Sequence, residues 1–190
     1  SAESTDLADL INVQSGVSIS GSSIQGNAGD DTFTVTTTTL NDTGVKGGAD
    51  DDSFAITAST ITGSTNYGGN GADSFTLNAT AKIASSTIFG GSDTSTTKDG
   101  ADFINVTGGL TITSSVINGN GGADTVNVYT PLFTRSNAGG GGGNDSVSVG
   151  AGVATTYEVI NSTLAGGKGN DTLYIGGTNG VVNSSSIYGG

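Results

Sequence analysis

Apolar and polar residues alternate in short segments of this chain, and the segments recur at a nearly constant interval. Each follows an aspartate, with apolar side chains two and four positions beyond it, as in Asp31-Thr32-Phe33-Thr34-Val35. A period of two is the pattern of a β-strand with one buried face. The apolar pairs are Ile11/Val13, Phe33/Val35, Phe54/Ile56, Phe75/Leu77, Ile104/Val106, Val126/Val128, Val147/Val149 and Leu173/Ile175.

Two weaker apolar marks follow each of these strands. The second mark falls at Val17/Ile19, Leu40, Ile61, Ala81/Ile83, Leu110/Ile112, Leu132/Phe133, Val153 and Val181. The third precedes the next glycine-rich turn, at Ile24, Val45, Tyr67, Ile88, Ile117, Ala138, Leu164 and Ile187. A helix fits poorly, because few windows lack glycine and apolar residues recur at two rather than at three and four. The pattern predicts three short strands per repeat.

The repeat length is set by the aspartates Asp9, Asp31, Asp52, Asp73, Asp102, Asp124, Asp145 and Asp171, whose spacings are 22, 21, 21, 29, 22, 21 and 26. A unit of this size cannot bury its apolar face alone and must stack on copies of itself. We therefore predict an all-β fold, a single-domain parallel β-helix or β-solenoid of about eight coils over residues 1–190. Stacking at about 4.8 Å would place Phe33, Phe54 and Phe75 in one aromatic ladder.

Two intervals depart from the period. Residues 93–99 form a seven-residue insertion, because removing them restores a spacing of 22. The interval before Asp171 holds about four or five extra residues, by the same comparison of repeats, and we place them near Tyr157 and Glu158. The chain starts within the pattern at Ser1 and stops where a further glycine turn would begin, so we expect a fragment of a longer array.

Composition narrows the function. Without a period, 34 glycines in 190 residues would indicate disorder. The chain has no cysteine and no histidine, which excludes disulfides, thiol or imidazole metal sites and Ser-His or Cys-His nucleophile pairs. A net charge of -12 argues against nucleic acid and anionic membranes as partners. No run of 18 apolar residues is present, so no membrane insertion is expected.

Stacked coils would bring the aspartates into a column of like charges. Neighbours in such a column repel by about 1 kcal/mol in water and by several at a lower effective dielectric. Thirteen of the 17 acidic residues fall in or beside this edge, and five Lys and Arg cannot neutralise them. Calcium takes six to eight oxygen ligands, which carboxylates and glycine-turn carbonyls can supply, whereas magnesium and zinc fit less well. The alternative is that each aspartate only closes its turn by bonding local amides.

Three turns have the same glycine pattern, at residues 68–73, 140–145 and 166–171. Other turns differ by one residue: Asn27 and Asn120 replace the second glycine, and Asp50 replaces the next one. The pattern resembles the G-G-x-G-x-D-x-U-x nonapeptide of the RTX (repeats-in-toxin) family. The resemblance implies a secreted bacterial or phage-associated protein, extracellular or at the cell surface. It also implies several Ca²⁺ ions between adjacent coils, held by glycine-segment carbonyls and closing aspartates.

The family repeats its motif every nine residues and binds calcium on both edges, whereas here the motif occurs once per coil. One calcium edge is therefore expected, similar to the single-edged solenoids of some large bacterial surface adhesins, including an ice-binding one. The metal-site residues that the resemblance implies are Asp30, Asp31, Asp50, Asp51, Asp52, Gly68, Asn70, Asp73, Asp102, Gly119, Gly121, Asp124, Gly140, Gly142, Asp145, Gly166, Lys168 and Asp171.

Three function classes remain open. A calcium-stiffened rod, structural or adhesive, needs no further site. An ice- or carbohydrate-binding module would use outward rows, one at Thr32, Ser53, Ser74, Thr125, Ser146 and Thr172 and the next at Asn12, Thr34, Thr76, Asn105, Asn127 and Ser148, interrupted by Ala55, Phe103 and Tyr174. A polysaccharide-modifying β-helix enzyme fits least, because the few cations are scattered and no histidine exists. Open strand edges at the ends favour end-to-end association with neighbouring repeats.

Overall fold

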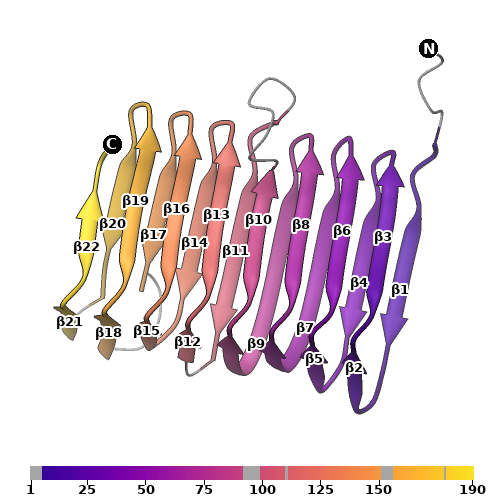
Figure 1. Ribbon diagram of the computed structural model, residues 1–190, viewed down its shortest axis with the longest axis horizontal. Coiled ribbons are helices and arrows are strands. Elements are labelled where there is room, and N and C mark those ends of the chain that lie inside the picture. Colours follow the sequence, from indigo (N-terminus) through magenta and orange to yellow (C-terminus); the bar gives the residue numbers. More distant parts are fainter. Residues whose placement is uncertain (1–5, 92–98, 110, 151–155, 178) are drawn as a thin grey trace.

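The protein is described by a computed structural model, which covers residues 6–91, 99–109, 111–150, 156–177 and 179–190. These residues form strands and turns, with no helix among them. The strands stack in parallel, coil upon coil, into a rod (Figure 1), so the predicted all-β solenoid is confirmed. Within the described part of the chain, no helical segment is long and apolar enough to cross a bilayer.

Each coil contributes strands to three columns. The first column follows the aspartates and contains β1 (Leu10–Gln14), β4 (Thr32–Thr36), β7 (Ser53–Thr62), β9 (Ser74–Ala84), β11 (Phe103–Gly108), β14 (Thr125–Tyr129), β17 (Ser146–Val149) and β20 (Thr172–Ile175). The second column contains β2 (Ser18–Ser20), β5 (Thr39–Asn41), β12 (Thr111–Thr113), β15 (Leu132–Thr134), β18 (Thr156–Ile160) and β21 (Asn179–Asn183). In β7 and β9 the first and second strands are continuous, so these two coils have one long strand where two were predicted.

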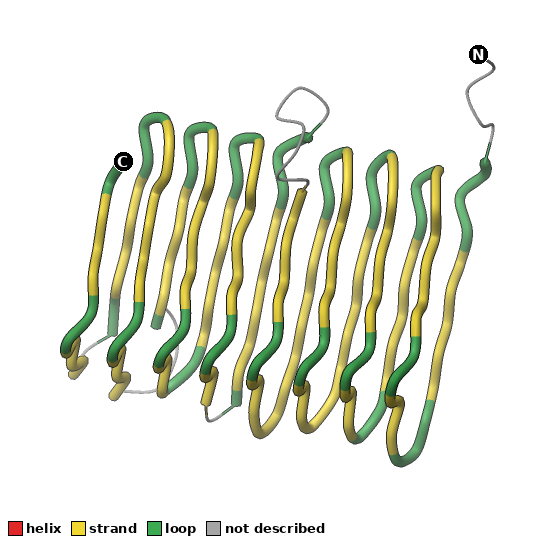
Figure 2. The backbone as a smooth tube through the Cα atoms, in the orientation of Figure 1, coloured by secondary structure: helices red, strands yellow, loops and turns green. Residues whose placement is uncertain are grey.

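The third column forms a separate eight-stranded sheet that faces the first. It contains β3 (Ser23–Ala28), β6 (Gly44–Ala49), β8 (Thr65–Asn70), β10 (Thr87–Gly91), β13 (Val116–Gly121), β16 (Asn137–Gly142), β19 (Thr163–Lys168) and β22 (Ser186–Tyr188). Residues 92–98 aside, glycine-rich turns join the third strands to the first strands that follow them along one edge of the rod, and the second strands lie along the opposite edge (Figure 2).

The core consists of stacked columns of apolar side chains. Pairing is one-to-one between equivalent positions, for example Phe33 with Phe54 and Phe54 with Phe75. The three rings are buried and stacked, with centroids 4.6 and 4.1 Å apart and planes inclined by 5°. The predicted aromatic ladder is therefore confirmed. Burial of the apolar pairs of the first strands supplies the main driving force for coil stacking.

Within the weaker apolar marks, the assignments of Tyr67 and Val181 were wrong. In β8 the inward residue is Asn66, paired with Val45 and Ile88, whereas Tyr67 points outward. The Tyr67 ring meets the edge of Phe89 on the outer face, with centroids 6.5 Å apart. Because β8 must stay in phase with both neighbouring strands, register overrides the polarity of one residue.

The second column ends with Val159 and Val182 at the inward positions, so the assignment of Val181 was wrong. Val153 lies outside the described residues. Tyr157 and Glu158 belong to β18, in register with β15, so the extra residues of this coil come between β17 and these two positions, near the predicted place. Most of the 93–99 insertion also lies outside the described residues, and Asp99 bridges to Gly71.

Candidate functional site

The closing aspartates of the inner coils turn their side chains into the rod, whereas Asp9 in the first coil is exposed. We call Asp9, Asp31, Asp52, Asp73, Asp102, Asp124, Asp145 and Asp171 the aspartate column. The six members between Asp31 and Asp145 are only 1 to 3 % exposed. They were predicted in one set with Asp30, Asp50 and Asp51, the outer-turn acids, which are exposed, so burial divides the predicted set. The column lies inside the rod, beside the glycine-turn edge.

From Asp31 to Asp171, one carboxylate oxygen of each member accepts a hydrogen bond from the neighbouring coil. The backbone N–H of each aspartate donates to Oδ1 of the next aspartate along the chain, over 2.7 to 2.9 Å, from Asp9 to Asp171. Such charge-assisted bonds to backbone amides are stronger than neutral ones. The column therefore links each coil to its neighbour. Bonding of backbone amides by the aspartates is also what the turn-closing alternative expects.

The second carboxylate oxygen is buried without a hydrogen-bond partner. This holds for Oδ2 of Asp31, Asp52, Asp73, Asp102, Asp124, Asp145 and Asp171. Each Oδ2 occupies the space that a Cβ would need on the first glycine of its own turn, at Gly26, Gly47, Gly68, Gly90, Gly119, Gly140 and Gly166. None of these glycines has a positive φ. The first glycine of the motif is therefore needed for space.

Backbone carbonyls share this space. A Cβ on Gly47 would meet both Asp52 Oδ2 and, at 2.7 Å, the carbonyl oxygen of Gly68. A Cβ on Gly68 would likewise collide with Asp73 Oδ2 and the carbonyl oxygen of Gly90. An unpartnered carboxylate oxygen of one coil thus converges with a carbonyl oxygen of the next. These are the oxygen types that calcium prefers.

The second motif position needs glycine for conformation. Gly69 has φ +131, and a Cβ there would also strike the carbonyl of Gly48. Asn27 and Asn120 hold the equivalent position in other coils with φ of 89 and 81. Asparagine tolerates this region better than most residues, which accounts for the motif variants seen in the sequence.

Burial perturbs the acidity of the column. Desolvation raises the pKa of Asp102 to about 9 and of Asp73 to about 8, and it raises the pKa of Asp52 and Asp124 to about 7. The hydrogen bond from the neighbouring amide opposes this shift, and the charges of adjacent aspartates add to it. Near neutral pH the column is therefore balanced either by protons or by bound cations.

The outer-turn acids are exposed and already bonded. Asp30 Oδ1 accepts the N–H of Asp51 at 3.1 Å, Asp51 Oδ1 accepts the N–H of Ala72 at 2.7 Å, and Asp50 Oδ2 accepts the N–H of Gly29 at 3.2 Å. A shallow depression of about 300 Å³ lies on these turns, lined by Ala49, Asp50, Asp51, Asn70 and Gly71. The predicted set is thus divided between an outer group and the buried column.

The remaining predicted ligands are turn backbone groups. Gly119, Gly140 and Gly166 lie against their own aspartates, as described above. The carbonyls of Gly142 and Lys168 accept the N–H groups of Gly122 and Gly143, and the Gly121 N–H donates to Asp99 Oδ2 at 3.0 Å. Among the described residues no three carboxylates surround one point, so a cation here would hold one or two carboxylates and complete its shell with carbonyls and water.

A second polar column at the opposite edge was not predicted. The N–H of Thr43, Ser64, Ser86, Ser115, Ser136 and Ser162 each donates to the hydroxyl of the equivalent residue in the next coil, over 3.1 to 3.3 Å. We call Thr43, Ser64, Ser86, Ser115, Ser136, Ser162 and Ser185 the serine column. In the sequence, a Ser or Thr stands two residues before the first inward residue of each strand in the third column, from Ser22 to Ser185.

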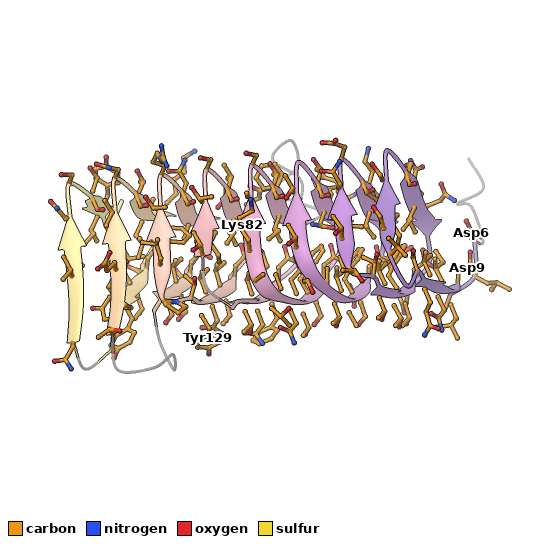
Figure 3. All side chains as sticks on the ribbon, turned by 90° about the horizontal axis from the view of Figure 1, so that it is seen from below. Asp6, Asp9, Lys82 and Tyr129 are labelled. Atoms are coloured by element: carbon orange, nitrogen blue, oxygen red, sulfur yellow. The ribbon has the colours of Figure 1, made fainter. Side chains whose placement is uncertain are left out.

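The outer face of the first-strand sheet carries the predicted rows. Thr32, Ser53, Ser74, Phe103, Thr125, Ser146 and Thr172 pair in sequence along one row. The adjacent row contains Asn12, Thr34, Ala55, Thr76, Asn105, Asn127, Ser148 and Tyr174. Neither row holds a charged residue, although the chain carries a net charge of -12. Outer side chains, Tyr129 among them, project away from the ribbon (Figure 3).

Comparison of the chain with protein-family models, with curated proteins and with solved structures found no match. Three features of the rod bear on its function. These are the aspartate column with its unpartnered oxygens, the exposed acids of the outer turns, and the uncharged outer rows.

Proposed function

We propose that this chain is a calcium-binding structural or adhesive module, a stiff rod within a larger secreted or surface protein. The observation that carries the proposal is the run of seven buried carboxylate oxygens without hydrogen-bond partners. Burying an ionised carboxylate is very unfavourable unless it is paired or coordinates a metal. Divalent cations between coils would neutralise the column and hold adjacent coils together.

The residues present fit calcium in their chemistry. Oδ2 of Asp52 and the carbonyl oxygen of Gly68 come from adjacent coils and face one space, and the same arrangement holds for Asp73 with Gly90. When bound, the ion would supply positive charge and bridge two coils. Calcium also accepts irregular geometry, which suits a site completed by carbonyls and water. Extracellular calcium modules bind with Kd values of roughly 10⁻⁴ to 10⁻³ M, which suits a protein outside the cell. The proposal includes no catalytic role.

The test compares the purified chain in excess EDTA with the same chain in millimolar calcium. Elemental analysis and calorimetry should find several calcium ions per chain. Chelation should lower the melting temperature and reduce the β signal in circular dichroism, because binding energy stabilises the fold. Magnesium at equal concentration serves as the control and should restore less stability. An identical spectrum and melting temperature in EDTA and calcium, with no bound ion, would refute the proposal.

A second candidate is an ice- or carbohydrate-binding module that uses the first-strand face. It is favoured by the two uncharged outer rows, whose hydroxyl and amide groups repeat with the coil spacing. Thermal hysteresis or glycan-array binding would detect this activity. Thr125→Lys and Ser146→Lys would place charges in the row and should abolish it, whereas Thr163→Lys on the third-strand face should not. Equal activity in all three variants would exclude this face.

A further inference from the structure

Asn66 is the polar exception in an apolar column. The equivalent positions in the other coils are Ile24, Val45, Ile88, Ile117, Ala138, Leu164 and Ile187. Asn66 is 0 % exposed, and neither its Oδ1 nor its Nδ2 has a hydrogen-bond partner. Burying an amide without hydrogen bonds is unfavourable, so an asparagine in this column needs a polar neighbour.

The nearest inward position on the same strand provides that neighbour. Asn66 and Gly68 face the interior two residues apart in β8, and Asp73 Oδ2 occupies the space of the missing Gly68 side chain. That oxygen is also buried without a partner. Inward positions two apart in a strand are separated by about 6.6 Å. The amide and the carboxylate oxygen therefore occupy neighbouring positions in the interior, and no direct hydrogen bond joins them.

The chemistry of the two groups limits what can lie between them. Asn66 offers an amide donor and a carbonyl acceptor, and Asp73 Oδ2 accepts hydrogen bonds. A bridging molecule must therefore accept from Nδ2 and donate to Oδ2. A bare metal ion would bind the oxygens but leave the amide donor unpaired. A single water molecule meets both demands and typically makes about three bonds when buried.

We infer that the coil formed by β7 and β8 encloses one structural water molecule, hydrogen-bonded to the Asn66 amide and to Asp73 Oδ2. In the other coils a hydrocarbon side chain stands beside the aspartate column and no such bridge can form. The site makes one coil of a repetitive rod chemically distinct. It holds whether a proton or a cation balances Asp73, because a carboxyl oxygen can accept a hydrogen bond in either case.

The test uses ¹⁵N-labelled full-length chain in millimolar calcium and measures cross-relaxation between water and side-chain amides. The Asn66 Nδ2 protons should show contact with a long-lived water, and the number of long-lived waters, measured by the relaxation dispersion of the solvent, should be lower by one in Asn66→Val. Valine stands at the equivalent position in the preceding coil, as Val45, so this variant should fold. Asn78→Val, on the outer face, is the matched control and should retain the signal. A direct bond from Asn66 to Asp73, or an Asn66 amide without water contact, would overturn the inference.

Discussion

Asp73 Oδ2 lies where the side chain of residue 68 would be if that residue were not glycine. The two residues are five positions apart, and the same distance separates Gly47 from Asp52 and Gly140 from Asp145. In the motif, the aspartate side chain therefore fills the space that the glycine leaves open. Loss of the glycine should displace the carboxylate, and loss of the carboxylate should lower the cost of replacing the glycine.

Gly68→Ala should destabilise the rod by about 1–3 kcal/mol, the range for overpacking a well-filled interior. The added Cβ would collide with Asp73 Oδ2 and with the carbonyl oxygen of Gly90, neither of which can move far. Urea denaturation followed by circular dichroism would measure the loss. Gly44→Ala is the matched control, because the nearest atom to its Cβ lies 4.0 Å away and its φ is ordinary. It should change stability by less than about 0.5 kcal/mol.

The pairing itself is tested by a double-mutant cycle. In an Asp73→Ala background, Gly68→Ala should cost clearly less than it does in the parent chain, because one of the colliding atoms is gone. Contacting residues usually show coupling of about 0.5–3 kcal/mol. Strict additivity of the two substitutions would mean that the glycine is needed for another reason.

Asp73→Asn should have opposite effects with and without calcium. The amide keeps an oxygen for the N–H of Asp52 and places an N–H donor where Oδ2 faces the Gly90 carbonyl. In EDTA above neutral pH the variant should therefore be more stable than the parent chain. In millimolar calcium it should be less stable, by about 1–3 kcal/mol, because it lacks a charged ligand oxygen.

Melting temperatures of both proteins in the two buffers would show this reversal. Asp42→Asn removes the same charge at an exposed position outside the aspartate column, and asparagine tolerates its φ of 47. It should show no reversal. If Asp73→Asn is destabilising by equal amounts in EDTA and calcium, Asp73 has a structural role and no role in binding the ion.

The fold could be predicted because the period imposes one environment on each set of equivalent residues. Phe33, Phe54 and Phe75 occupy one column, and a single copy of the strand pattern defines their direction. Asn66 was missed for the converse reason. Its neighbours in the stack determine that it faces inward, whereas local hydrophobicity favours Tyr67.

The site was only partly predictable. The aspartates and glycines were identified, but a polar residue beside a turn is normally assigned to solvent, so the inward direction of Asp52 and Asp73 was not foreseen. Their direction depends on the space left by a glycine five residues earlier. The serine column escaped notice because serine and threonine are abundant throughout the chain, which hides a periodic hydroxyl such as that of Ser115.

Ser115→Ala should destabilise the rod by about 1–3 kcal/mol, because it leaves a buried N–H without an acceptor. The hydroxyl of Ser115 accepts the N–H of Ser86 at 3.3 Å and donates to the carbonyl of Thr113 at 2.9 Å. Ser53→Ala makes the same change on the outer face, where it should cost less than about 0.5 kcal/mol. Chemical denaturation of both variants in calcium would compare them. Equal losses would show that the serine column does not stabilise the stack.

Stability should depend on pH in opposite directions with and without calcium. In the folded, metal-free chain, burial raises the pKa of Asp73 to about 8 and of Asp102 to about 9, from 3.8. Between the unfolded pKa of 3.8 and these raised pKa values, the folded state binds more protons than the unfolded state. The free energy of unfolding therefore falls as pH rises through this interval. The contribution of these carboxyls is fully present below about pH 4 and is lost as pH rises through 7 to 9.

Calcium should change the sign, because the ion binds ionised carboxylates and competes with protons. In millimolar calcium the melting temperature should rise from pH 5 to pH 8, while in EDTA it should fall over the same interval. A series of melting curves in the two buffers, at constant ionic strength, would show the two trends cross. Parallel trends in EDTA and calcium would mean that the ion does not replace protons on the aspartate column, and the column would then be held by hydrogen bonds and protons alone.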